Sequence, residues 1–362
     1  MNTKQLTGEA VELLKLLVAT PRTSRNEEAA ATLFADFIAA QGLHPQREAN
    51  NIWCVADGYD EARPTLLLNA HLDTVKAAAS WIRDPLTPTM EGDRLYGLGT
   101  NDDGASLVSL TQAFRILSSR PQTYNLILLA SAEEEVSGRD GVERALRQLP
   151  RIDVALVGEP TGMQPAIAEK GLMVLDVTAR GKAGHAARNE GINAIYRALD
   201  DIQWFRNFRF ADESPLLGPV KMSVTVINAG SQHNVVPDEC RFTVDVRTNE
   251  CYSNEEVYQL VCRFVDSEVH ARSFRLNSSQ IAPDHPLVRR ALALGPAADG
   301  RSRAAFGSPT LSDQALMSWP SMKMGPGDSS RSHTADEFIC VREIHEAIED
   351  YVAMLDGLEL RK

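Results

Sequence analysis

The 362-residue sequence is poor in cysteine, and its few cysteines do not suggest a shared site. The five residues are odd in number, and none belongs to a CxxC motif: Cys54, Cys240, Cys251, Cys262 and Cys340. Neither a disulfide framework nor a thiolate zinc site is therefore indicated. We expect reduced structural thiols, so any metal would have to be held by histidine and carboxylate side chains.

The sequence also lacks an excess of basic residues and lacks long hydrophobic runs. Its 37 basic and 49 acidic residues give a net charge of −12, which disfavours nucleic acid or an anionic membrane as the main partner. No segment is long and apolar enough to span a bilayer. Glu9, Glu12 and Lys15 interrupt the N-terminal apolar residues at helical spacing, unlike a signal peptide. We therefore expect a cytoplasmic protein that binds neither nucleic acid nor membranes.

Length and hydrophobic patterning predict two domains, because the chain is long enough for two cores at about 150 residues each. In the first 170 residues, near-continuous apolar strands are expected at 51–56, 65–70, 124–130 and 154–158, and helices at 24–42, 104–119 and 139–149. This alternation is typical of an α/β layer sandwich whose sheet is covered on both faces. Ser24 and Glu27 stand at capping-box spacing at the start of the helix at 24–42.

The hydrophobic pattern changes near residue 171 and returns to its first form after Pro283. Between these points the pattern predicts strand, helix, strand, strand, helix and strand at 171–182, 193–205, 221–230, 240–248, 253–266 and 271–279. Ser253 and Glu256 form a second capping-box pattern. This order is that of a ferredoxin-like α+β domain. The sequence thus predicts an α/β domain formed by residues 1–170 and 283–362, interrupted by a smaller domain at 171–282.

Residues able to bind a metal occur at five places in the predicted α/β domain. They are His71 and Asp73 in "HLD", Asp102 and Asp103 in "GLGTNDD", Glu133, Glu134 and Glu135 in "EEE", Glu159 in "GEPT" and His333 in "SHTADEF". Open α/β sheets place their sites at the carboxyl ends of the strands. A catalytic zinc site needs about three protein ligands, and a two-metal site also needs a bridging carboxylate. A lone histidine is more often an ordinary packed residue, and adjacent glutamates are more often a solvated helix start. The clustering is what indicates a metal site.

In this order the five motifs resemble a family of dinuclear zinc deacylases and metallopeptidases. The family includes acetylornithine deacetylase and succinyl-diaminopimelate desuccinylase, and the resemblance covers essentially the whole chain. It implies a zinc-peptidase-like α/β catalytic domain with an inserted ferredoxin-like dimerisation domain, or lid. It also implies two Zn²⁺ per subunit, and the same ligands accept Co²⁺.

The resemblance assigns a role to each matched residue of the α/β domain. Asp102 would bridge both metals. His71 and Glu159 would complete one site, and Glu135 and His333 the other.

Further roles follow from the same resemblance. Asp73 would orient His71 through a hydrogen bond. Glu134 would be the general base, which takes a proton from the attacking water and delivers it to the leaving amine. Gly325 and Gly327 lie in "GPGDSS", which resembles the family's flexible substrate-contacting turn.

Three residues of the inserted domain also match. By resemblance, His185 would reach the active site of the partner subunit in a homodimer and polarise the scissile carbonyl. Asn234 would assist at the oxyanion, and Arg247 would bind the α-carboxylate of the substrate with its two-donor fork. Taken without the resemblance, His185 and Asn234 are typical turn residues, and Arg247 is a typical surface charge.

The turn that carries the bridging acid departs from the family pattern. Leu98 stands where the family commonly has arginine, and Asp103 follows directly on Asp102, so either acid could be the bridge. The spacing from Gly97 and Gly99 favours Asp102, and we expect Asp103 to point elsewhere.

The resemblance implies a zinc-dependent amidohydrolase that removes an N-acyl group from an amino acid. The segment "MGPGDSSRSHTADEFI" is most similar to deacylases of arginine and lysine biosynthesis, which favours N-acetyl- or N-succinyl-L-ornithine as the substrate. A succinyl group would require an additional cation, for which Arg331, Lys323 and Arg188 are candidates. The alternatives are succinyl-diaminopimelate desuccinylation, dipeptidase or carboxypeptidase activity, and a non-catalytic relative. The last is disfavoured because Glu134 and every ligand position are filled.

Overall fold

The structure, a computed structural model, describes residues 3–188, 190–297 and 300–361. The chain forms two compact units, of which the first comprises Met1–Ile167, Ile281–Phe306 and Ser312–Lys362, and the second Ala168–Gln280 and Gly307–Leu311. Among the described residues, no helix combines the length and the apolar character that crossing a membrane would require.

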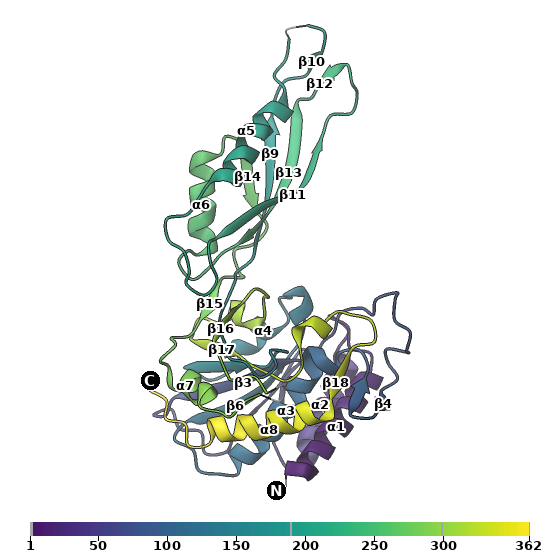
Figure 1. Ribbon diagram of the computed structural model, residues 1–362, viewed down its shortest axis with the longest axis vertical. Coiled ribbons are helices and arrows are strands. Elements are labelled where there is room, and N and C mark those ends of the chain that lie inside the picture. Colours follow the sequence, from purple (N-terminus) through teal and green to yellow (C-terminus); the bar gives the residue numbers. More distant parts are fainter. Residues whose placement is uncertain (1–2, 189, 298–299, 362) are drawn as a thin grey trace. The chain divides into compact units, whose positions relative to one another are not determined.

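The first unit is built on a mixed sheet with the strand order β1-β2-β6-β3-β7-β17-β8 (Figure 1). The strands are β1 (Gln46–Glu48), β2 (Asn51–Val55), β3 (Thr65–His71), β6 (Asn125–Ser131), β7 (Val154–Val157), β8 (Ala166–Glu169) and β17 (Ser321–Lys323). Strand β3 pairs in parallel with β6 and β7, and β17 pairs in parallel with β7. The carboxyl ends of these four strands therefore meet at one edge. The strands expected at 51–56, 65–70, 124–130 and 154–158 are confirmed.

Both faces of this sheet are covered, as the alternation along β3 shows. Leu66, Leu68 and Ala70 belong to one hydrophobic cluster, and Leu67 belongs to another. The first cluster includes residues of helices α1 (Thr3–Ala19), α2 (Glu28–Ala40), α3 (Ala105–Ser118), α7 (Pro286–Leu292) and α8 (Val341–Leu355). The second cluster includes residues of the short α4 (Val142–Leu146) and η3 (Asp313–Leu316). The predicted α/β layer sandwich is confirmed, although the helix expected at 139–149 is reduced to α4.

Short elements at the ends of strands carry the expected site residues. A small antiparallel sheet has the order β18-β5-β4 and consists of β4 (Thr89–Glu91), β5 (Arg94–Tyr96) and β18 (Phe338–Cys340). The helical turn η1 (Thr100–Gly104) precedes α3, η2 (Glu134–Val136) follows β6, and η4 (Ser329–Arg331) follows β17. Asp102, Glu134 and Glu135 lie in η1 and η2.

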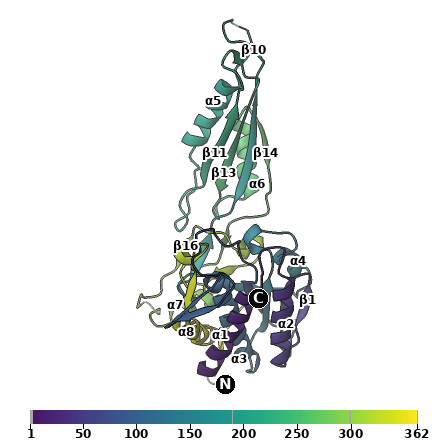
Figure 2. The same cartoon turned by 90° about the vertical axis from the view of Figure 1, so that its right-hand side faces the viewer.

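The second unit contains a four-stranded antiparallel sheet with the order β11-β13-β9-β14 (Figures 1 and 2). Its elements are β9 (Met173–Arg180), α5 (Ala194–Asn207), β11 (Lys221–Ala229), β13 (Glu239–Arg247), α6 (Asn254–Phe264) and β14 (Glu268–Ala271). Alternate residues of β9 are buried and share a hydrophobic cluster with residues of α5 and α6. The order of elements confirms the ferredoxin-like plan.

The second unit also contains shorter pairings. Strand β10 (Gly184–His185) pairs with β12 (Val235–Val236). Strand β15 (Ser279–Gln280) pairs with the last two residues of β8, and β16 (Phe306–Ser308) also pairs with β8.

The capping box expected at Ser24 and Glu27 is wrong. Helix α2 begins at Glu28 without a side-chain cap. The Ser24 hydroxyl instead donates to Asp73, and the Glu27 carboxylate accepts hydrogen bonds from the backbone N–H groups of Arg25 and Glu133. The second expected capping box, at Ser253 and Glu256 of α6, is confirmed. The same sequence spacing thus serves a helix start in one unit and tertiary contacts in the other.

The strand expected at 271–279 is also wrong, because β14 ends at Ala271. The segment that follows keeps only isolated contacts with the β9 side of the sheet, where the Arg272 N–H donates to the Val174 carbonyl and the Leu172 N–H donates to the Leu276 carbonyl, and it is also bound to the start of α6. The Asn277 side chain accepts from the Asn254 backbone N–H, and the carbonyls of Phe274 and Leu276 accept from the Asn254 side-chain amide. Hydrogen bonds to Asn254 therefore take up groups of this segment that a continuous strand would have paired with β9.

Candidate metal centre

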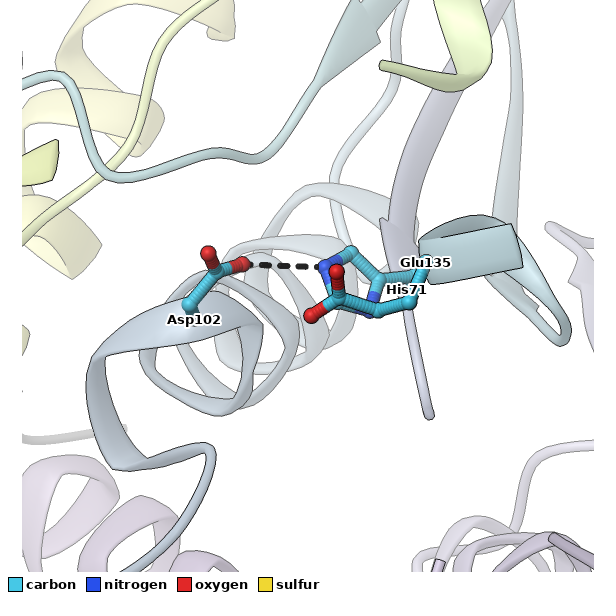
Figure 3. A group of neighbouring side chains, drawn as sticks. All are labelled: His71, Asp102 and Glu135. Carbon is cyan, nitrogen blue, oxygen red and sulfur yellow. Dashed lines mark hydrogen bonds and ion pairs between the residues drawn. The ribbon is translucent and has the colours of Figure 1, made fainter. Parts of the chain in front are cut away.

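Side chains from separate segments converge on the carboxylate of Asp102. His71, the last residue of β3, places Nε2 3.1 Å from Asp102 Oδ1, and His333 places Nε2 3.6 Å from Asp102 Oδ2. His333 Nε2 also lies 2.9 Å from Glu135 Oε2. Ligand atoms of His71, Asp102 and Glu135 all lie within 4.8 Å of one another (Figure 3). The two oxygens of Asp102 therefore face two different histidines.

These distances suit side chains that share metal ions. Two ligand atoms on one tetrahedral cation, each bonded at about 2.0–2.2 Å, lie roughly 3.3–3.6 Å apart. The two separations between Asp102 and the histidines, 3.1 and 3.6 Å, are close to this range. Imidazole and carboxylate donors without thiolate are suitable ligands for Zn²⁺ and Co²⁺. The donor set therefore fits a metal site that includes His71, Asp102 and Glu135.

Glu159, the fifth predicted ligand, follows β7 and is 9% exposed. Burial raises its pKa well above the ordinary value, and the nearby charges of Asp102 and Glu134 raise it further. A buried carboxylate in this state is stabilised as an anion when a cation lies beside it. Among the predicted ligands, it is Asp102 whose charge acts on Glu159, and the charge of Lys323 opposes the rise in pKa.

Asp73 connects several of these residues from a fully buried position. Its Oδ1 lies 3.5 Å from His71 Nδ1. Its carboxylate accepts hydrogen bonds from the Ser24 hydroxyl at 2.7 Å and from the backbone N–H groups of Glu134 and Glu135 at 3.0 and 3.2 Å. His71 Nδ1 is also 3.0 Å from the Asp73 backbone carbonyl oxygen, within hydrogen-bond distance. Asp73 therefore orients the histidine mainly through its backbone carbonyl, and its carboxylate fixes the turn that bears the next two acids. Ser24 is a supporting residue that sequence reasoning missed.

Glu134 is half-buried beside this centre. Burial raises its pKa well above the ordinary value; the charge of His71 opposes this shift, and those of Asp313 and Glu135 add to it. Asp313, at the start of η3, is itself buried and accepts hydrogen bonds from Asn69 and the Ser131 hydroxyl at 2.9 and 2.5 Å. Sequence reasoning missed Asp313, since no motif marks it. This environment favours proton uptake by Glu134, as general acid–base chemistry requires.

Asp103, the alternative bridging acid, takes no part in these contacts. It is fully buried, and neither carboxylate oxygen has a hydrogen-bond partner among the described residues. Burial is the main cause that raises its pKa to about 8. Glu337, a buried acid in the "SHTADEF" motif that was not singled out, has a pKa raised to about 7, again mainly by burial.

In the second unit, the structure brings His185 and Asn234 together. His185 lies opposite Val235 in the pairing of β10 with β12, and the Asn234 carbonyl accepts a hydrogen bond from the Ala186 N–H. Both residues are exposed. Arg247 ends β13, where Nε and one terminal nitrogen donate to Asp245 at 2.9 and 3.1 Å. The fork that was expected to bind a substrate carboxylate is thus paired with Asp245.

Gly325 and Gly327 are buried within the first unit. A Cβ on Gly325 would lie 2.5 Å from the Ser106 hydroxyl oxygen and 2.6 Å from the Glu159 carbonyl oxygen. Gly327 has a φ of +87°, and a Cβ there would lie 2.3 Å from the Asn101 side chain. Both glycines allow the "GPGDSS" turn to approach the metal centre closely. Their contact with substrate stays a prediction.

The chain is similar to known proteins over most of its length. Residues 67–357 match the model of a family described as peptidase family M20/M25/M40. Acetylornithine deacetylase of Proteus mirabilis (strain HI4320) is 26% identical, with 91% of each chain covered. Acetylornithine deacetylase of Klebsiella pneumoniae (strain 342) is 27% identical, with 92% of this chain and 94% of the relative covered.

Two solved structures share the fold. An M20 family metallo-carboxypeptidase from Sulfolobus solfataricus has a TM-score of 0.73 at 17% identity, with 96% of this chain and 98% of that chain covered. A dinuclear metal-binding peptidase of the M20 family from Bacillus subtilis has a TM-score of 0.74 at 16% identity, with 97% of each chain covered. The predicted fold class is thereby confirmed.

We predict that the chelator-treated, metal-free protein loses stability as the pH rises from 6 to about 8. The folded-state pKa of Asp103 is about 8 and that of Glu337 about 7, whereas carboxyl groups of an unfolded chain titrate near about 4. The folded state therefore retains protons that the unfolded state has released, and ionisation opposes folding until the pH passes the folded pKa. The raised pKa values of His71 and His333 act in the same direction.

Thermal unfolding of metal-free and metal-loaded protein across this pH range is the measurement. Bound cations should offset the buried acids, so the loaded protein should show the weaker pH dependence. A melting temperature of the metal-free protein that stays constant or rises between pH 6 and about 8 would contradict the prediction.

Proposed function

We propose, from the membership of this chain in peptidase family M20/M25/M40, that the protein removes the acyl group of an N-acyl amino acid, N-acetyl-L-ornithine in particular. The chain belongs to this family because it matches the family model over residues 67–357. It is a metallohydrolase of this family. The observation that carries the proposal is the carboxylate of Asp102, whose oxygens face His71 and His333. The substrate is supported by the relatives named acetylornithine deacetylase, which the chain matches over nine-tenths of its length. Such a reaction would belong to arginine biosynthesis in the cytoplasm.

In the proposed enzyme, His71, Glu159 and Asp102 would hold one Zn²⁺, and Glu135, His333 and Asp102 would hold the other. Co²⁺ is an alternative occupant, because the same donors accept it. When bound, such a pair of cations supplies a Lewis acid for the substrate carbonyl and a water that ionises near neutral pH.

Glu134 moves the proton in this scheme. Its carboxylate takes a proton from the attacking water as the new C–O bond forms at the acyl carbon. It then delivers that proton to the amine nitrogen as the C–N bond breaks, which releases a carboxylic acid and the free amino acid. Its raised pKa supports both steps, because the group can accept the proton and also return it. Asp73 keeps Glu134 in place by accepting a hydrogen bond from its backbone N–H.

The second unit contributes substrate contacts in this proposal. His185, supplied by a partner subunit, polarises the scissile carbonyl, and Asn234 stabilises the developing oxyanion. Arg247 binds the α-carboxylate of the amino acid, for which it exchanges its present partner Asp245. His185 lies in β10 and Asn234 directly precedes its partner strand β12, and this proximity supports a joint role for these two residues.

The charges near the site support an acetyl group over a succinyl group. Arg331 donates two hydrogen bonds to Glu343, at 2.8 and 3.2 Å, and its charge is thus already paired. Lys323 is 2% exposed, which places it in the core. Arg188 is exposed in the second unit. Neither Arg331 nor Lys323 therefore offers a free cation for a second carboxylate.

We predict that the zinc- or cobalt-loaded protein hydrolyses N-acetyl-L-ornithine with a kcat/KM at least about tenfold above those for N-succinyl-ornithine, N-succinyl-diaminopimelate, acetylcitrulline and several dipeptides. If neither Arg331 nor Lys323 binds a second carboxylate, a succinyl group loses the charge partner that it would need, which favours the acetyl substrate. Steady-state rates of amine release across the panel are the measurement. Comparable values across the panel would refute the substrate assignment, and a preference for dipeptides would support a peptidase.

Replacement of the proposed base should stop chemistry and leave metal binding intact. Glu134→Gln keeps the size of the side chain but removes the proton acceptor, so we expect kcat to fall by about 10²–10⁴-fold. Metal content, measured on the same preparation, should equal that of the wild type. Glu133→Gln is the matched control, because Glu133 is adjacent and is not expected to act on substrate. Unchanged turnover in Glu134→Gln would rule out the assignment.

Exposed apolar residues in the second unit support a homodimer. Strand β11 lies at the edge of the sheet, and among the described residues its one strand partner is β13. Val226 and Ile227 of β11 are 50% and 52% exposed, and Tyr196 and Leu199 of the neighbouring α5 are 68% and 44% exposed. An open strand edge beside apolar side chains is a typical surface for pairing with a second copy of the same strand.

We predict that Val226→Lys converts the dimer to a monomer, because it places a charge on the apolar edge. Sedimentation velocity of the wild type and the variant is the measurement. Ile82→Lys is the control: Ile82 is also exposed, but it lies in the first unit, so the dimer should persist. A monomeric wild type, or a dimeric Val226→Lys variant, would contradict the proposed interface.

A further inference from the structure

We propose that Arg22 and Glu337 form a buried clamp that fixes the backbone of the turn bearing Asp102 and so positions the metal ligands. The inference rests on the metal-dependent function proposed above. It assigns a positioning role to two residues of the first unit that do not themselves face the metal ligands' side chains.

Arg22 lies beneath the site and is 3% exposed. One terminal nitrogen of its guanidinium donates to the Leu72 carbonyl, and the other donates to the Gly99 carbonyl at 2.9 Å. Leu72 lies between His71 and Asp73, and Gly99 directly precedes η1, which carries Asp102. A single rigid side chain therefore joins the two segments that hold the facing pair His71 and Asp102.

Glu337 binds the same turn and is 2% exposed. Its Oε1 accepts hydrogen bonds from the backbone N–H groups of Asn101 and Asp102 at 2.8 and 2.9 Å, and its Oε2 accepts from the Gly99 N–H at 3.2 Å. Glu337 thus holds the N–H of Gly99 while Arg22 holds its carbonyl. The peptide groups on both sides of Gly99 are held by opposite charges.

The two charges are complementary. Burial lowers the pKa of Arg22, and the charge of Glu337 is the largest influence that raises it again, followed by that of Asp73. Either ion alone would be costly in the core, and the backbone hydrogen bonds to both terminal nitrogens of Arg22 and to both oxygens of Glu337 offset part of that cost. Because an arginine stays ionised in proteins, this positive charge remains beneath the acidic cluster whether or not metal is bound.

The turn is shaped to receive the guanidinium. Gly99 has a φ of +74°, and a Cβ at this position would lie 2.4 Å from a terminal nitrogen of Arg22 and 2.4 Å from the Thr74 methyl carbon. A side chain here would therefore displace Arg22, which explains why glycine is required. The clamp and the turn form one unit, since the loss of either charge would free the peptide groups that hold Asp102 in place.

The test measures metal affinity instead of catalysis. Arg22→Met and Glu337→Gln remove one charge each, and the double variant removes both. Competition with a chromophoric chelator gives the affinity, and the absorption spectrum of bound Co²⁺ gives the ligand geometry, both well below the melting temperature of each variant. Arg303→Met is the matched control, because the Arg303 side chain is 2% exposed and is bonded to Asp350 and the Met163 carbonyl, away from the predicted ligands.

We expect each single variant to bind metal about 10–100-fold more weakly than the wild type, as is usual when residues that support metal ligands are lost. The double variant should be no weaker than the worse single variant, because the two residues act together. Arg22→Lys should also lose affinity, since one ammonium group cannot bind both carbonyls as the planar fork does. If Arg22→Met does not fold, Arg22→Lys still tests the proposal. Arg303→Met should lower the melting temperature and leave metal affinity unchanged.

Wild-type affinity and an unchanged Co²⁺ spectrum in Arg22→Met and Glu337→Gln, with only the melting temperature lowered, would overturn the clamp. So would additive losses in the double variant, or full affinity in Arg22→Lys. No substrate is needed for these measurements. A wild type that binds metal but hydrolyses no N-acyl amino acid would therefore contradict the proposed function and leave the clamp standing.

Discussion

The burial of several carboxyl groups close to one another is the constraint on which this structure depends. Burial raises the pKa values of Asp103, Glu134, Glu159 and Glu337, and neighbouring acids raise them further. Such a cluster does not stabilise the folded protein by itself, because each buried ionised acid needs a partner of opposite charge. The two histidines that face Asp102 and the fixed charge of Arg22 supply part of that balance. Divalent cations would supply the rest.

The fold makes this concentration of charge possible. Four parallel-paired strands end at one edge of the sheet, and the turns after β3, β6 and β7 place His71, Glu134 and Glu159 near one another. Asp73 then links the first two of these turns through its hydrogen bonds. The hydrophobic residues packed on both faces of the sheet fix the positions of the strand ends. The free energy of this packing offsets the unfavourable free energy of burying the acids.

Most of the fold and the facing side chains could be predicted from the sequence, whereas the groups that support them could not. The apolar strands and the motifs after them carry local signals, and these gave the sandwich, the inserted ferredoxin-like unit and the residues around Asp102. The capping box predicted at Ser24 and Glu27 was wrong because their spacing fits a helix cap, whereas their side chains form tertiary hydrogen bonds. The Ser24 hydroxyl donates to Asp73, and the Glu27 carboxylate accepts from the Glu133 N–H. Asp313 and Arg22 have no local pattern, since their partners lie far away in the chain.

Arg22 also bears on the departure at Leu98. The family that the motifs resemble commonly has arginine at that position, and here Leu98 is 6% exposed and apolar. A positive charge nevertheless lies beneath the same turn, because Arg22 reaches it from the segment that precedes α2 and binds the carbonyl of Gly99. A positive charge is required near this turn because of the buried acids, and it does not have to come from one particular position of the motif. A cation from another segment satisfies it as long as its donors reach the backbone that carries Asp102.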